Sequence, residues 1–195
     1  MQEKRDKNQK FQKFLCRNFF TKNSTGQIWV ETVIYTLIAL IMIGAILAFA
    51  VPKVSEVKDK TTIEQSINLI KDINEVIISV VQGGLGNKRI IEVNVKRGEL
   101  LIDGKNEEIN FTIETDYVYS EPDKQITLGN VNAITERTGG TYKVTLNSEY
   151  GYDIKYDGDS DGIKTLTQST TPYKLSIENK DKNSAGKIIV EINLI

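Results

Sequence analysis

One stretch of the sequence places carboxylates at the spacing that calcium loops use. Asp157, Asp159 and Asp161 alternate with small residues ahead of Gly162, and hard oxygen ligands at alternate positions can converge on one ion. A complete loop of this kind has an acidic bidentate ligand at its twelfth position, where this chain has Gln168. Two interpretations stay open: a calcium site, or a solvated acidic turn.

Other residues that could do chemistry are scarce. The 195-residue sequence contains no histidine, which removes the commonest general base and the commonest transition-metal ligand. The single cysteine, Cys16, has no partner for an internal disulfide or a multi-cysteine metal site. We therefore do not expect an enzyme, and calcium is the only cofactor to consider.

Two further patterns concern the surface of the protein. The sequence Asn110-Phe111-Thr112 matches the N-glycosylation sequon, although it lies in an expected strand, where access to Asn110 would be restricted. Several tyrosines could form an exposed aromatic patch, but their strand-like spacing favours core or cross-strand packing. These tyrosines are Tyr142, Tyr150, Tyr152 and Tyr156.

A long apolar segment precedes the part of the chain that carries these residues and must position it. Residues 32–51 are 20 consecutive residues without a charge, the length of a membrane-spanning helix. Residues 1–26 carry a net charge of +5 and the remainder −6, so we expect the N-terminus on the cytoplasmic side and the C-terminus outside. The acidic remainder argues against a nucleic-acid partner. A cleaved secretory signal is the weaker alternative, because Pro52 leads directly into another helical stretch.

The residues in front of this segment resemble a prepilin signal. A basic segment ends at Gly26, an apolar helix follows, and Glu31 is the fifth residue after the glycine. This arrangement is similar to the class III signal peptide of type IV prepilins, and Gln27 resembles the first mature residue of archaeal pilins and archaellins. The resemblance implies that a prepilin peptidase cuts between Gly26 and Gln27, with methylation of the new terminus in the bacterial pattern. The helix would then remain as the filament core.

Glu31 is a carboxylate at the border of the apolar segment, where it is costly in lipid unless something pairs with it. The new α-amino group on Gln27 of a neighbouring subunit would be a suitable partner, and that pair would fix the axial stagger of adjacent subunits. In the alternative, Glu31 and Trp29 lie at the membrane interface of an uncleaved anchor. Gly44 and Ala48, four residues apart, either admit a second helix closely or are ordinary small membrane residues.

Beyond Pro52 the helical periodicity continues but becomes amphipathic, and a glycine-rich run at 83–86 ends it. Pro52 either kinks this helix or begins its second half. The apolar stripe of this helix must be buried, and the C-terminal domain can cover it. The stripe consists of Val54, Val57, Ile63, Ile67, Ile70, Ile73, Ile77 and Val81.

After residue 86 apolar residues recur with a period of two, which indicates strands. We expect seven or eight of them, at 91–95, 100–102, 109–113, 126–128, 142–146, 150–156, 173–177 and 188–194. The fold class is therefore α+β, with a long N-terminal hydrophobic helix, transmembrane and then amphipathic, followed by an antiparallel β-sandwich-like head.

The predicted organisation has four segments. They are a basic leader peptide at 1–26, a transmembrane and filament-core helix at 27–51, an amphipathic extension at 52–84 and an extracellular β-rich head at 85–195. The prepilin resemblance implies a pilin or pseudopilin of a type IV pilus-like filament, whose partners are the prepilin peptidase, other pilin subunits, the assembly platform with its ATPase, and the membrane. The alternatives are a single-pass anchored β-domain with a binding role and, least favoured, an ectoenzyme.

Overall fold

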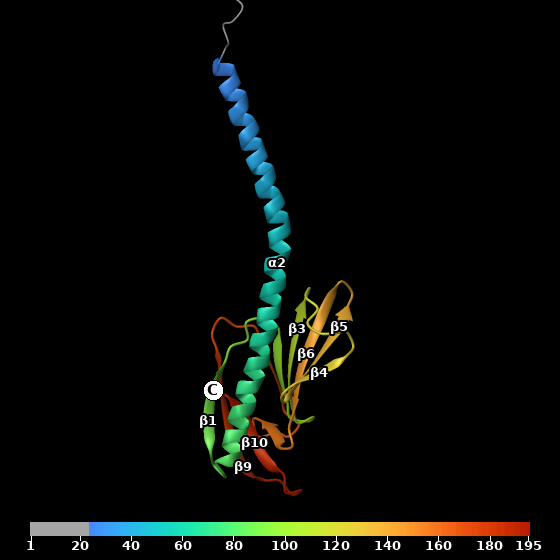
Figure 1. Cartoon of the computed structure of the whole chain (residues 1–195). Coiled ribbons are helices and arrows are strands. Elements are labelled where there is room, and N and C mark those ends of the chain that lie inside the picture. The colour runs from blue at the N-terminus through green and yellow to red at the C-terminus, as the bar shows by residue number, and fades with distance from the viewer. Residues whose placement is uncertain (1–23) are drawn as a thin grey trace, which may run out of the picture. The chain divides into compact units, whose positions relative to one another are not determined.

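The computed structural model describes residues 24–195, with side chains from Ile28 onward. Cys16 and most of the predicted leader therefore lie outside the described residues. The described chain begins with helix α2 (Ser24–Gln82) and continues in strands (Figure 1). It divides after Pro52 into two compact units, and each is described by itself.

In the first unit, α2 exposes apolar side chains at successive positions and therefore on every face. Ile34, Leu40 and Phe49 are 49%, 66% and 71% exposed, and the other large apolar residues between 28 and 51 are similar. The helix satisfies its own backbone polar groups, as a lipid environment requires. Among the described residues, α2 is the one helix long and apolar enough to cross a membrane. This arrangement is consistent with a single-pass membrane protein.

The second unit comprises α2 from Lys53 onward and two β-sheets. The smaller sheet has the strand order β1-β9-β10-β7, and the larger sheet has the order β4-β5-β6-β3-β2-β8. Neighbouring strands are antiparallel except for β10 and β7, which are parallel. The strands are β1 (Lys88–Val93), β2 (Glu99–Asp103), β3 (Glu108–Thr115), β4 (Gln125–Leu128), β5 (Val131–Thr138), β6 (Thr141–Glu149), β7 (Asp153–Tyr156), β8 (Ile163–Thr167), β9 (Tyr173–Lys182) and β10 (Ile188–Leu194).

Burial alternates along the strands, so each sheet has an inner and an outer face. In β3, for example, Ile109, Phe111 and Ile113 are buried while the residues between them are half-buried. The inner faces share one core with the buried stripe of α2, whose members are Ile63, Ile67, Ile70, Ile73, Ile77 and Val80. The predicted α+β class with a sandwich-like head is confirmed.

The helix ends where the glycine-rich run predicted. Gly84 and Gly86 have φ angles of 83° and 78°, a left-handed backbone that glycine adopts without steric cost. The Gly86 amide then donates to the carbonyl oxygen of Asn179 at 2.8 Å. The turn that stops α2 is thereby attached to β9.

Two strands, β5 and β8, were not among those expected. The inner positions of β5 include Ala133 and Thr135, and a small and a polar residue weaken the apolar alternation that marks a strand. In β8 only Leu166 is buried. The parallel β10–β7 pair also departs from the expected antiparallel arrangement. Alternation within one strand carries no information about the direction of its neighbour.

The apolar stripe of the amphipathic helix is covered over a shorter length than expected. Val54 and Val57 are 51% and 66% exposed, whereas Ile63 is fully buried. The head covers α2 only from Asp59 onward, where the first buried residue of the helix occurs. At the C-terminal end of α2, the expected stripe residue Val81 is half-buried, and its neighbour Val80 is fully buried instead.

Candidate functional sites on the apolar helix and the head

Glu31 lies on the exposed surface of α2 among apolar neighbours. The hydroxyl of Tyr35, one turn further along, donates to its Oε1 at 3.1 Å. Trp29 nearby is 72% exposed. The backbone at the predicted cleavage site, Gly26-Gln27, lies within α2, but the side chains of these two residues are outside the described part of the structure. The cleavage site therefore stays a prediction.

Gly44 leaves a gap in the apolar surface of the first unit. A side-chain carbon built on Gly44 would meet nothing within 4 Å, so a second helix can approach the backbone closely there. The exposed apolar side chains from Ile28 to Val51 form a larger apolar surface than a soluble monomer carries. The first unit is thus a surface that needs a partner, either lipid or other helices.

Asp59 is the first residue of α2 that the head buries, and it is held by several donors. The Thr115 hydroxyl donates to Oδ2 at 2.6 Å, the Asp116 amide donates to the same atom at 3.3 Å, and the Arg97 guanidinium forms an ion pair with Oδ1. Arg97 also donates to the carbonyl oxygen of Glu114. This Asp59 cluster joins α2 to the β1–β2 connection and to the end of β3.

The donors around Asp59 change its acidity. Burial alone would raise the pKa of this carboxyl, but the hydrogen bonds from Thr115 and Arg97, the positive charge of Arg97 and the Asp116 amide together outweigh it, and the pKa is lowered. The ionised form is therefore stabilised in the folded head. Arg97 is about half exposed, so solvent screens part of its contribution.

A second polar cluster lies inside the head, between α2 and β6. Asn74 Nδ2 donates to Ser148 Oγ at 3.0 Å, and Ser148 Oγ donates to the carbonyl oxygen of Asn130 at 3.1 Å. The Tyr150 hydroxyl donates to Asn74 Oδ1, and burial raises the pKa of Tyr150 well above its usual value, the Ser148 hydrogen bond acting in the opposite direction. Asn74 and Ser148 are almost fully buried, so this cluster fixes how the helix sits against the sheet.

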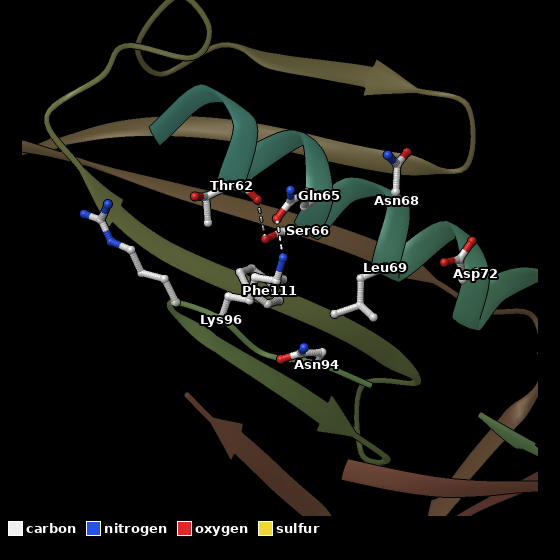
Figure 2. A pocket seen from close by; sticks show the side chains of 10 residues that line it. Thr62, Gln65, Ser66, Asn68, Leu69, Asp72, Asn94, Lys96 and Phe111 are labelled. Atoms are coloured by element: carbon white, nitrogen blue, oxygen red, sulfur yellow. Dashed lines mark hydrogen bonds between the residues drawn. The ribbon is translucent and has the colours of Figure 1, made fainter. Parts of the chain in front are cut away.

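A groove of about 200 Å³ runs between α2 and the segment that connects β1 to β2 (Figure 2). Thr62, Gln65, Asn68 and Asp72 line its helix wall, and Lys96 on the opposite wall donates to Gln65 Oε1 at 3.3 Å. Phe111 also contributes to the lining. The groove combines apolar surface with side chains of both charges, and its second cation, Arg97, already forms an ion pair with Asp59.

The predicted calcium residues lie in the turn between β7 and β8. Tyr156 and Asp159 exchange backbone hydrogen bonds of 3.1 and 3.0 Å, and the Asp161 amide donates to Asp159 Oδ1 at 3.0 Å. The side chains of Asp157, Asp159 and Asp161 are exposed. Within residues 24–195, no cluster of three or more acidic, histidine or cysteine side chains is placed to hold a metal ion. The turn holds itself by hydrogen bonds, and calcium binding stays a prediction.

Asn110, the predicted glycosylation site, lies in the middle of β3. Its Nδ2, the atom to which a glycan would be attached, donates to Glu108 Oε1 at 2.7 Å, and Asn147 Nδ2 on β6 donates to Glu108 Oε2 at 2.6 Å. The carbonyl oxygens of both asparagines are buried and have no hydrogen-bond partner in the described structure. Each such acceptor costs about 1–3 kcal/mol unless a donor reaches it. Glycan attachment to Asn110 stays a prediction, with its amide nitrogen engaged in the fold.

The tyrosines take the structural role that their spacing favoured. Tyr150, Tyr152 and Tyr156 are partly buried and pack against the core. Tyr142 is half-buried in β6. They do not form a separate exposed aromatic patch.

Sequence reasoning missed the Asp59 and Asn74 clusters, although each had a signal. Asp59 precedes Ile63 by four residues and so lies on the apolar stripe of the helix, where an acid requires a partner. Ser148 continues the alternation of Val144 and Leu146 and therefore faces inward. The partner residues were not predictable from spacing, because they come from strands distant in the chain.

No family model, no curated protein and no solved structure matches this chain.

Proposed function

We propose that this protein is a structural subunit, a pilin or pseudopilin, of a type IV pilus-like surface filament, assembled through its N-terminal hydrophobic helix. The observation that carries the proposal is the first unit of α2, which exposes apolar side chains on every face and carries one acid, Glu31. A helix of this kind needs either lipid or neighbouring apolar helices as its cover. In this proposal, lipid covers the helix in the membrane before assembly, and neighbouring apolar helices cover it in the filament core.

In this proposal the leader is removed on the cytoplasmic side by a prepilin peptidase that cuts between Gly26 and Gln27. The head then lies outside the cell, and an assembly platform with its ATPase moves the subunit from the membrane into the filament. The new amino group on Gln27 pairs with Glu31 of a neighbouring subunit. Only the Tyr35 hydroxyl is bonded to that carboxylate within the described residues, so it retains acceptor capacity for such an amine.

The alternative is a single-pass anchor that carries a binding domain and forms no filament. The two functions differ in the mature N-terminus. Intact-mass analysis of the membrane fraction would give a chain that starts at Gln27 for a filament subunit, and a chain that still contains Met1 and Cys16 for an anchor. The second result would contradict the proposal.

The role of Glu31 is tested with a matched pair of variants. We expect Glu31→Ala to be cleaved and inserted normally but to enter sheared filaments at a small fraction of the wild-type yield, because the pair that sets subunit stagger is lost. Glu56→Ala, an exposed acid further along the same helix, is the control and should assemble normally. Equal filament yields from the two variants would remove this account of assembly.

A further inference from the structure

Strand β1 forms one edge of the four-stranded sheet. It pairs with β9 on one side, and within residues 24–195 no strand lies on its other side. The side chain of Ile90, in the middle of β1, is 61% exposed. An open edge strand is a template on which a further strand can pair. The head therefore offers β1 as a surface for an extended chain.

Alternate residues of β1 direct their backbone groups toward this open edge. In an antiparallel sheet, the N–H and C=O groups of one residue point to the same side, and those of the next residue point to the opposite side. The Asn87 carbonyl oxygen accepts from the Asn179 amide of β9 at 2.9 Å, so Asn87 faces β9. It follows that Lys88, Ile90 and Glu92 face away from β9. Each offers one amide donor and one carbonyl acceptor to an incoming strand.

The side chains of these three residues form a pattern that is its own complement. Along the outer face of β1 they are basic, apolar and acidic in turn. If two copies of β1 align antiparallel with Ile90 opposite Ile90, Lys88 of each copy lies opposite Glu92 of the other, and the outward backbone groups of both copies face one another. A shift of one residue would misalign the outward backbone groups, and a shift of two would place Ile90 opposite a charge.

The two charges of β1 are available for such a contact. The side chains of Lys88 and Glu92 are 51% and 63% exposed. Within the sheet, Lys88 lies 3.8 Å from Glu178 and Glu92 lies 3.7 Å from Lys174, both on β9. These are long distances for ion pairs, so each charge can take a second partner of opposite sign.

The other edge strands do not have this property. In β8 the one charged residue is Lys164, with no acid to pair with it, and β4 carries no charge. In β7 the acid is Asp153, which is buried and accepts from Asn183 Nδ2 at 3.0 Å. Among the edges of the two described sheets, β1 is therefore the one whose exposed charges match a second copy of itself.

We propose that β1 pairs with β1 of a second copy of this chain, antiparallel and centred on Ile90, so that two four-stranded sheets become one continuous sheet. Backbone hydrogen bonds and the Ile90–Ile90 contact supply the attraction, and the Lys88–Glu92 pairs set the register. Both copies contribute the same surface, so the contact is isologous and closes with two copies.

This inference goes beyond filament assembly. Neighbouring subunits along a filament contact one another through heterologous surfaces, whereas a twofold contact closes on itself and does not extend the filament. Paired β1 strands would then link the heads of separate filaments, and many weak pairs would add along their length. That consequence rests on the proposed function. The pairing itself does not, because β1 belongs entirely to the head.

The first test is disulfide cross-linking of the full chain in excess detergent. Cys16→Ser removes the natural cysteine, and Ile90→Cys introduces one at the centre of the proposed pair. The Cα atoms of a hydrogen-bonded antiparallel pair are about 5.5 Å apart, within the span of a disulfide. Oxidation with copper phenanthroline should therefore give a covalent dimer. Ile163→Cys is the matched control, because Ile163 on the edge strand β8 is 57% exposed, and it should give little dimer.

The second test exchanges charges in the Ile90→Cys chain. Lys88→Glu places acids opposite each other at both ends of the pair, and Glu92→Lys places bases there, so each variant alone should lower the dimer yield about tenfold. An equimolar mixture of the two variants restores an acid opposite a base at both ends and should recover the yield. Both positions are exposed, and unchanged near-ultraviolet circular dichroism confirms that each variant is folded.

Equal cross-linking of Ile90→Cys and Ile163→Cys would overturn the proposal, and so would a mixture that gives no more dimer than the separate variants. In the latter case β1 would be an edge for another partner or another register. Both measurements are made in detergent and need no filament, so failure of filament assembly leaves them unchanged. Conversely, Lys88→Glu should assemble into filaments at wild-type yield, which separates failure of β1 pairing from failure of the proposed function.

Discussion

The two parts of helix α2 have similar backbones and opposite requirements. Before Pro52 the helix exposes its apolar side chains and has no cover of its own, whereas from Asp59 onward the inner faces of two sheets bury one stripe of it. Helical propensity is therefore not what separates them. The difference is whether the cover comes from the same chain or has to come from lipid or other helices.

Glu31, the one acid between residues 28 and 52, and Asp59, the one buried acid of the second part, differ in the same way. Asp59 receives hydrogen bonds from Thr115, Asp116 and Arg97, so the head satisfies it internally. Glu31 receives one hydrogen bond, from Tyr35 on its own helix. An acid with a full set of internal donors stabilises a fold. An acid with a partial set remains available for a contact between molecules.

The largest expected effect comes from truncating one buried residue of the second part. Ile70→Ala should destabilise the head by about 2–5 kcal/mol, because Ile70 is fully buried in the shared core. Ile41→Ala, at a position 63% exposed in the first part, should leave head unfolding unchanged. Urea unfolding followed by tyrosine near-ultraviolet circular dichroism measures both. Similar midpoints for the two variants would erase the distinction between the two parts of the helix.

A smaller effect is expected at the Asp59 cluster. Asp59→Asn should destabilise the head by about 1–2 kcal/mol at neutral pH, because it removes a charged acceptor from Thr115 and Arg97. Asp72→Asn, an exposed acid on the same helix, is the control and should cost little. Urea midpoints at pH 7 compare them. Equal stability of the two variants would show that the donors around Asp59 contribute nothing net.

The same variant carries a prediction for pH dependence. Because the pKa of Asp59 is lowered in the folded head, the unfolded chain binds this proton first as the pH falls. The stabilisation is thus fully present above the unfolded value of about 3.9 and is lost as the pH falls toward the folded pKa. The difference in unfolding free energy between wild type and Asp59→Asn should be constant from pH 7 to about 5 and shrink below it. A difference that grows in acid would contradict the lowered pKa.

The smallest expected effect compares two glycines. Gly84→Ala should cost the head about 1 kcal/mol, because its φ of 83° is strained for any residue with a side chain. Gly44→Ala replaces a helical glycine with open space around it and should leave the subunit intact. Within the proposed filament, however, Gly44→Ala should lower filament yield if another helix packs at that position. Thermal unfolding tests the first variant, and sheared-filament yield tests the second.

The sequence predicted the elements that follow from local periodicity. The apolar helix, its amphipathic continuation, the stop at Gly84 and most of the strands were all recognisable from spacing and turn residues. β5 was not, because Ala133 and Thr135 occupy inward positions that usually carry large apolar side chains. Its burial is decided by neighbours on β4 and β6, which no local pattern reveals.

The candidate sites were less predictable than the fold. Asn110 was recognisable as a sequon, but its contact with Glu108 and its alignment with Asn147 depend on the register of β3 with β6. A shift of one residue in that register would separate the two asparagines onto opposite faces of their sheet. Composition identifies which side chains are present, and register decides which of them meet.

The position of the last strand has a consequence for when the head can form. β10 (Ile188–Leu194) lies between β9 and β7 in its sheet, so β7 has no place in that sheet until β10 has been synthesised. Val190 and Ile192 of β10 also belong to the shared core, which therefore stays incomplete until then. A polypeptide truncated before Ile188 should fail to fold its head and be degraded. Each copy must carry β10 before it presents a finished surface.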